Sequence, residues 1–174
     1  MRHTIGVVMD NKPGVLSRIS QLLARRGFNI DSITAGPTRN HDVTRMTVVV
    51  EGDDYVADQA AEEMSKLEDV LRIERLSPVG STRREIMLIK VRASKAERTE
   101  IVDLAKIMDC AIVDISPTTL MLEHSDTPEK IDLLVQLLGE YEILDMARGG
   151  AIALNSGEEE EYIFESGAFA GEQA

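Results

Sequence analysis

The spacing of apolar residues divides the first half of the chain into short alternating and longer helical stretches. Runs that are β-branched or that alternate with period two predict strands at residues 4–9, 28–35, 45–51 and 70–77. Apolar residues at helical spacing predict one helix between Gly14 and Gly27 and another at residues 55–67. The predicted order is strand, helix, strand, strand, helix, strand.

The second half of the chain repeats this order after a short polar segment. Strands are predicted at residues 85–91, 110–115, 119–123 and 143–154, the last interrupted near two glycines, and helices at 96–108 and from Thr127-Pro128 onward. Such a βαββαβ order is typical of the ferredoxin-like arrangement. We therefore predict an α+β protein of two ferredoxin-like domains, at residues 1–77 and 83–155, joined by a linker at 78–82. Exposed sheet edges favour a homodimer.

Charge and composition narrow the class of protein. The net charge is −12, and six of the excess negative charges are glutamates in residues 157–174. The absence of a basic footprint argues against a nucleic-acid partner, and the lack of an apolar run near 20 residues argues against a membrane protein. We expect a soluble, cytoplasmic protein without a signal peptide, and a disordered acidic tail at 156–174.

One polar turn stands out as candidate chemistry. Asp10-Asn11-Lys12-Pro13-Gly14 connects the first strand to the first helix. A helix N-terminus presents unpaired N–H groups that suit a carboxylate, and Gly14 permits close approach to the backbone. Asn11 offers both a donor and an acceptor. A plain strand-to-helix turn explains the same residues, and Asn29 could equally face a site or solvent.

Other chemistry-bearing residues favour structural roles. The three histidines, His3, His41 and His124, lie in different elements without ligand spacing, so no metal site is expected. Cys110 begins a predicted buried strand, which favours a core thiol over a nucleophile. Because it is the only cysteine, it excludes an intramolecular disulfide and a cysteine-based zinc site.

Several segments together resemble one family. The stretch "NKPGVLSRISQLLARRGFNIDSI" is similar to the start of an ACT domain, a small-molecule-sensing version of the ferredoxin-like fold. In combination with "RMTVVVEGD", "LEDVLRIERL", "REIMLIKV", "VDISPTTLMLE", "TPEKID" and "ILDMARGGAIAL", it resembles the small, regulatory subunit of acetohydroxyacid synthase, also called acetolactate synthase. The resemblance covers nearly everything from Met1 to Leu154.

The resemblance implies a regulatory protein with no catalytic residues of its own. Such subunits bind a large catalytic subunit, whose thiamine diphosphate, Mg²⁺ and FAD serve the condensation of pyruvate with a second 2-keto acid. They raise its activity and confer feedback inhibition by branched-chain amino acids, usually valine. Two ACT domains pair, with the effector between them. On this chain Asn11, Pro13, Gly14, Val15 and Leu16 would form one side of the site, and Asn29 and Ile30 of the second copy the other.

Two other functions remain open at the level of sequence. A stand-alone amino-acid-sensing regulator could be built from the same two domains and act on another partner. A small enzyme could use the open face of a sheet, although no general acid–base pair suggests a reaction.

Overall fold

The computed structural model describes residues 1–157, so most of the predicted acidic tail lies outside the described residues. The chain divides into two compact units. Among the described residues, the first holds Met1–Asp31, Ala35–Thr82 and residues 154–157, and the second holds Arg83–Ala153 and also Ser32–Thr34. Each unit is described by itself below.

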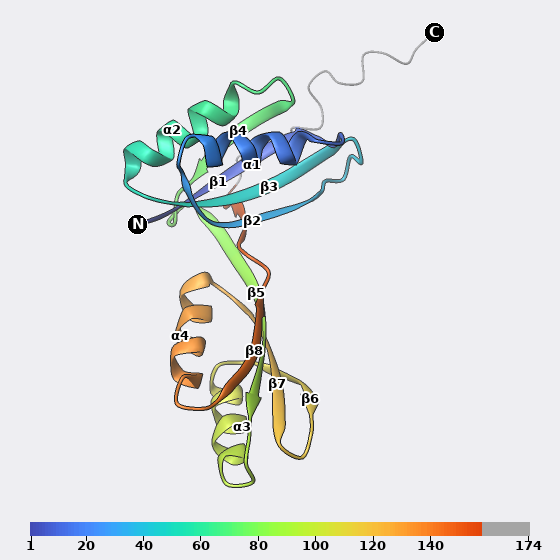
Figure 1. The fold of residues 1–174 in the computed structure, drawn as a ribbon, viewed down its shortest axis with the longest axis vertical. Helices are drawn as coiled ribbons and strands as arrows, with labels where there is room; N and C mark the ends of the chain where they lie inside the picture. Colours follow the sequence, from blue (N-terminus) through green and yellow to red (C-terminus); the bar gives the residue numbers. More distant parts are fainter. Residues whose placement is uncertain (158–174) are drawn as a thin grey trace. The chain divides into compact units, whose positions relative to one another are not determined.

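The first unit is a four-stranded antiparallel sheet with two helices on one face (Figure 1). The strand order is β2-β3-β1-β4, which is the ferredoxin-like order predicted from the sequence. The elements are β1 (Arg2–Asp10), α1 (Val15–Arg25), β2 (Asn29–Pro37), β3 (Val43–Glu51), α2 (Asp54–Ser65) and β4 (Val70–Leu76). The central strand β1 pairs antiparallel with β3 and with β4, while β2 lies at an edge.

The side chains on one side of β1 explain why the helices pack where they do, although β1 is buried continuously from Thr4 to Met9. Ile5, Val7 and Met9 are buried on one side of the strand, and Ile19 and Leu23 of α1 are fully buried with them. Aliphatic and methionine side chains fill this core, as expected for a chain with no Trp and only 3% aromatic residues.

The end of α1 is fixed by the glycine that the sequence singled out. Gly27 has φ +74°, its N–H donates to the Ala24 carbonyl, and the Phe28 N–H donates to the Leu23 carbonyl. This pair of bonds is the Schellman arrangement, which needs a left-handed residue and so favours glycine. The chain can therefore turn directly from α1 into β2.

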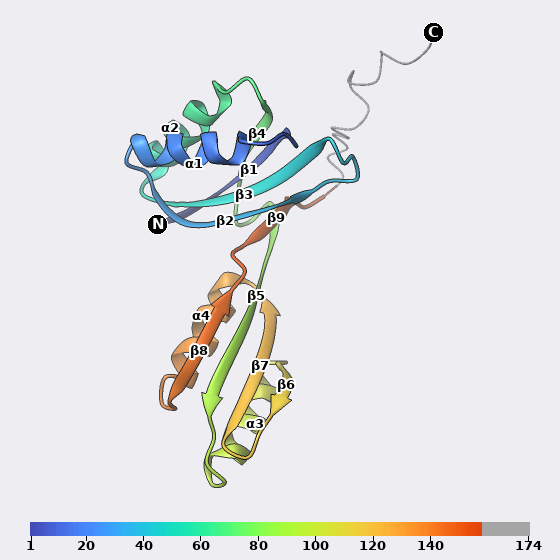
Figure 2. The ribbon, with the colours of Figure 1, turned by 45° about the vertical axis from the view of Figure 1, so that its right-hand side comes forward.

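The second unit repeats the topology (Figure 2). Its strand order, β6-β7-β5-β8, corresponds element by element to that of the first sheet. The elements are β5 (Ser81–Arg92), α3 (Glu97–Ile107), β6 (Ala111–Ile115), β7 (Thr119–Asp126), α4 (Pro128–Leu138) and β8 (Ile143–Arg148), and β9 (Ile152–Asn155) pairs with β5. The predicted fold class is thus confirmed.

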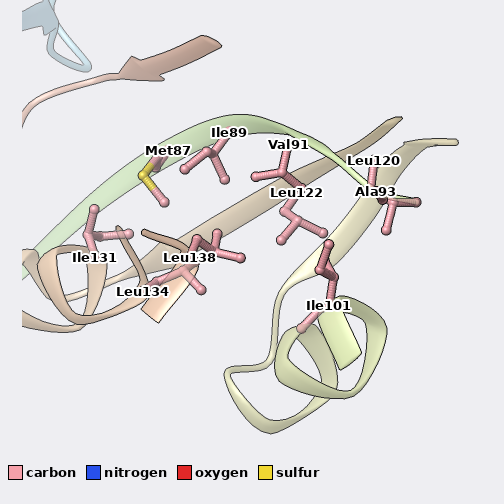
Figure 3. Packing of buried hydrophobic residues seen from close by; sticks show 11 residues of the cluster. Met87, Ile89, Val91, Ala93, Ile101, Leu120, Leu122, Ile131, Leu134 and Leu138 are labelled. Atoms are coloured by element: carbon pink, nitrogen blue, oxygen red, sulfur yellow. The ribbon is translucent and has the colours of Figure 1, made fainter. Parts of the chain in front are cut away.

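One apolar cluster holds the second sheet against its helices. Met87, Ile89 and Val91 alternate along β5 and meet Leu120 and Leu122 of β7 (Figure 3). Ile101 of α3 and three residues of α4, Ile131, Leu134 and Leu138, complete the buried layer. Each of these side chains is at most 1% exposed, so the layer is continuous from α3 to α4.

Several element boundaries differ from those predicted, and three of the differences are the most informative. β5 starts at Ser81, inside the segment predicted to be a linker, and β2 continues to Pro37. The last strand is two strands, because Gly150 has φ +75° and ends the regular pairing after Gly149 donates to the Ile86 carbonyl. Turn residues near a strand end do not reveal how far backbone pairing continues.

Candidate functional site

The β1–α1 turn leaves the start of α1 without an internal cap. Gly14 precedes the helix with φ +88°, no side chain of residues 1–157 caps the helix, and its first turn has no acidic residue. The Val15 N–H makes a long bond of 3.3 Å to the Lys12 carbonyl, and the Leu16 and Ser17 N–H groups donate to none of the described residues. The positive end of the helix dipole is therefore available to an anion.

Asn11 is held in one orientation beside this helix start. Its backbone N–H donates to the Asp42 carbonyl at 2.7 Å, and its side-chain Nδ2 donates to the His41 carbonyl at 2.7 Å. The side-chain carbonyl oxygen is left to accept a hydrogen bond. An ammonium group could donate a hydrogen bond to this oxygen.

A cavity of about 320 Å³ opens between the turn, the start of α1 and the end of β2. Three of the predicted site residues line it: Asn11, Val15 and Leu16. The other lining residues are Met9, Asp10, Lys12, Ala35, Gly36, Pro37 and Thr44. This volume lies at the lower end of the range for small-molecule sites.

The remaining predicted residues are not among those that line the cavity. Pro13 and Gly14 shape the turn, and Gly14 has no atom within 4 Å of where a Cβ would stand. Asn29 and Ile30 begin β2, whereas the cavity touches its end. Ile30 and Gly36 are six steps apart along the strand, about 20 Å. One copy of the chain therefore does not bring all seven predicted residues together.

Two opposite charges lie at the cavity. Lys12 Nζ donates to Asp10 Oδ2 at 2.5 Å, and this bond is the main cause that raises the pKa of Lys12, with Asp69 and Glu68 adding to it. Asp69 has its own counterion, because Arg18 approaches it at 2.6 Å. The cavity thus combines a helix start, one carboxylate, one ammonium and an apolar wall.

Sequence reasoning missed the wall contributed by β2 and β3. Ala35 ended a predicted strand, Pro37 lay just beyond it, and Thr44 carried no recognisable motif. This wall follows from the topology, because the ferredoxin-like strand order places β3 beside β1 and β2 beside β3. The cavity could have been anticipated from that order but not from any single residue.

The other candidate residues fall elsewhere in the molecule. Cys110 precedes β6 and packs against the second core, and burial, with a smaller contribution from Asp109, raises its pKa to about 11. A thiol so protonated is a poor nucleophile. Residues 1–157 contain no cluster of three or more metal-ligating side chains. Over the same residues, no helix has the length and apolarity to cross a membrane.

Comparison with known proteins covers almost the whole chain. Residues 5–72 match the model of the AHAS small subunit-like ACT domain, and residues 84–157 match the model of the small subunit of acetolactate synthase. A probable acetolactate synthase small subunit of Archaeoglobus fulgidus is 41% identical over 157 residues, covering 90% of this chain and 98% of that protein. The chain belongs to the acetolactate synthase small-subunit family.

Further members of the family agree in sequence and in fold. The acetolactate synthase small subunit of Mycolicibacterium smegmatis is 38% identical over 155 residues, which cover 89% of this chain and 91% of the relative. The crystal structure of the small subunit from Thermotoga maritima superposes with a TM-score of 0.82 at 32% identity, covering 90% of this chain and 98% of that one. The resemblance found in the sequence is confirmed.

Proposed function

We propose that this chain is the regulatory subunit of acetolactate synthase. It binds the catalytic subunit, raises its activity and makes that activity sensitive to a branched-chain amino acid, with valine the leading candidate. Membership of the small-subunit family over nearly the full length carries the proposal. The condensation itself belongs to the catalytic subunit with its thiamine diphosphate, Mg²⁺ and FAD.

The cavity at the β1–α1 turn supports the effector part of the proposal. The α-carboxylate would accept from the uncapped N–H groups of Leu16 and Ser17. The Asn11 carbonyl oxygen would accept from the ammonium group. The aliphatic side chain would lie against Val15 and Leu16, and the volume of about 320 Å³ accommodates one small amino acid.

A second copy of the chain would complete this site. β2 is an edge strand, so its outer backbone groups are available for pairing. If two β2 strands pair antiparallel across a two-fold axis, the start of each strand lies beside the end of the other. Asn29 and Ile30 of one copy would then approach the cavity at Gly36 and Pro37 of the other, which explains why one copy separates them.

Such a shared site would couple binding to regulation. An amino acid that contacts both copies stabilises one arrangement of the pair over another and shifts the population toward it. Because one methylene in an apolar pocket changes affinity only by about 1–3 kcal/mol, valine, leucine and isoleucine should compete for the same site.

Reconstitution with the catalytic subunit tests the proposal. Pyruvate condensation by the cognate catalytic subunit is measured with and without this chain, and each mixture is titrated with valine. The proposal predicts higher activity with the chain and inhibition by valine only when the chain is present. No association and no change in activity would reject it and favour a stand-alone amino-acid sensor.

A further inference from the structure

In the Asp10–Lys12 ion pair at the cavity, the lysine side chain is much more exposed to solvent than the aspartate. Asp10 carries the only carboxylate among the described residues that line the cavity, and its side chain is 26% exposed. Its counterion Lys12 is 66% exposed and sits only two residues away on the same turn. The neighbouring acidic residue, Asp69, is bound instead by Arg18 of α1. Asp10 therefore presents a partly shielded carboxylate to the cavity, and its counterion is a flexible side chain that is mostly exposed to solvent.

A ligand with its own ammonium group can replace Lys12 on Asp10. Ion pairs of exposed lysines contribute little stability, because water and salt screen them and the long side chain must be ordered. A bound ammonium group, by contrast, would be held by the carboxylate inside the cavity and by the rest of the ligand at once. Exchange of one ammonium for another also leaves the net charge on Asp10 balanced.

Such an exchange would let the site distinguish amino acids from 2-keto acids. A 2-keto acid with the carbon skeleton of valine has the same carboxylate and the same side chain, so neither the start of α1 nor the apolar wall separates the two. It has a carbonyl oxygen where the amino acid has an ammonium, so it cannot donate to the Asp10 carboxylate and cannot replace Lys12 there. This difference matters for the proposed function, because the catalytic subunit works among 2-keto acids.

We propose that Asp10 receives the ammonium group of the effector, that Lys12 is the counterion it displaces, and that this exchange selects α-amino acids over their 2-keto acids. The inference rests on the proposed effector site. It assigns the discrimination to a carboxylate that the sequence motif alone did not single out.

Binding to the purified full chain tests the exchange. Calorimetric titrations with L-valine and with 3-methyl-2-oxobutanoate compare the wild type with Asp10→Asn and Lys12→Met. The wild type should prefer valine by about 100-fold or more. Asp10→Asn should weaken valine binding about tenfold or more and leave binding of the keto acid within about twofold. Lys12→Met should tighten valine binding by about two- to fivefold, because the competing ammonium is gone.

A matched pair elsewhere in the chain provides the control. Lys106 and Asp103 form a comparable exposed ion pair on α3, at 3.1 Å, outside the cavity. Asp103→Asn and Lys106→Met should leave both titrations unchanged, and thermal unfolding of all four variants checks that each is folded.

The outcomes separate this inference from the proposed function. If the wild type binds valine and Asp10→Asn binds it equally well, only the role of Asp10 is overturned. Weaker binding by Lys12→Met would mean that Lys12 holds the effector carboxylate, and would also overturn the exchange. If the wild type binds no branched-chain amino acid, the proposed effector site fails and this inference fails with it.

Discussion

The two strand-to-helix turns that follow β1 and β5 occupy the same place in the same topology, yet they treat their helix starts in opposite ways. At the β1–α1 turn, Gly14 provides no side-chain cap and no acid follows in the first turn. At the β5–α3 turn, the Glu97 N–H donates to Ser94 Oγ, while Glu97 Oε2 accepts from the Ser94 N–H. This reciprocal capping box satisfies the helix start from within the chain.

The difference indicates which half of the repeat can hold an anionic ligand. In the second unit the helix start is satisfied, and Glu97 and Glu100 place negative charge in its first turn. Both features disfavour a carboxylate ligand there. In the first unit the corresponding groups are open and adjoin a cavity. The two units share a fold but not a binding site, because the residues of the strand-to-helix turn determine whether the helix start can bind an anion.

The largest effect should follow from damage to the core of the second unit. Leu134 is fully buried in the apolar cluster, so Leu134→Ala should lower the free energy of unfolding by about 2–5 kcal/mol. Leu133 is the matched control, because it neighbours Leu134 on α4 but is 44% exposed, and Leu133→Ala should change stability by about 0.5 kcal/mol or less. Denaturant unfolding measures both. Equal losses would show that the layer in Figure 3 does not hold this unit together.

A negative charge at the β1–α1 turn should weaken effector binding. Gly14→Asp would set a carboxylate beside the proposed carboxylate position, and we expect valine affinity to fall by about 30-fold or more, about 2 kcal/mol. Gly14→Asn is the control, because it adds nearly the same side chain at φ +88° without the charge, and a Cβ meets no atom within 4 Å. Calorimetry measures both affinities. Similar losses in the two variants would assign the effect to backbone strain rather than to charge.

Replacement of a buried histidine should strengthen the second unit. His124 on β7 is 2% exposed, and neither ring nitrogen has a hydrogen-bond partner within residues 1–157. It pairs with Met87 on the helix-facing side of the sheet. His124→Leu removes the unsatisfied polar atoms at similar volume, so the free energy of unfolding should rise by about 1–2 kcal/mol. A lower melting temperature would indicate that the imidazole has a partner in solution.

Removal of the cap at the second turn should have the smallest effect. Ser94→Ala should cost about 1 kcal/mol of stability and leave valine binding unchanged. The hydrogen bonds from Ser94 lower the pKa of Glu97, so their contribution is present above the ordinary glutamate pKa and is lost as the pH falls through the lower pKa of the folded state. Unfolding measured from about pH 3 to pH 6 should therefore show a smaller difference between wild type and variant at the acid end, where only the bond from the Glu97 N–H to Ser94 Oγ remains. If the difference in stability between wild type and variant does not change with pH, the Glu97 carboxylate contributes nothing to the cap and only the bond to Ser94 Oγ matters.

The fold was largely predictable from hydrophobic spacing, and the site only in part. Period-two runs and Gly27 located the strands and the end of α1, because these features depend on neighbouring residues. The cavity wall at Ala35, Pro37 and Thr44 depends on which strands become neighbours. No local pattern encodes that arrangement. The capping box at Ser94 and Glu97 did have a local sequence signature. Its relevance to function becomes clear only when the capped start of α3 is compared with the uncapped start of α1.

Amide hydrogen exchange, measured with and without valine, tests most directly whether the two turns differ in function. We predict that saturating valine slows exchange at Leu16 and Ser17, whose N–H groups would bind the effector carboxylate, and leaves Glu97 and Arg98 at the second turn unchanged. Protection at the second turn instead, or at neither turn while valine is bound, would contradict the account.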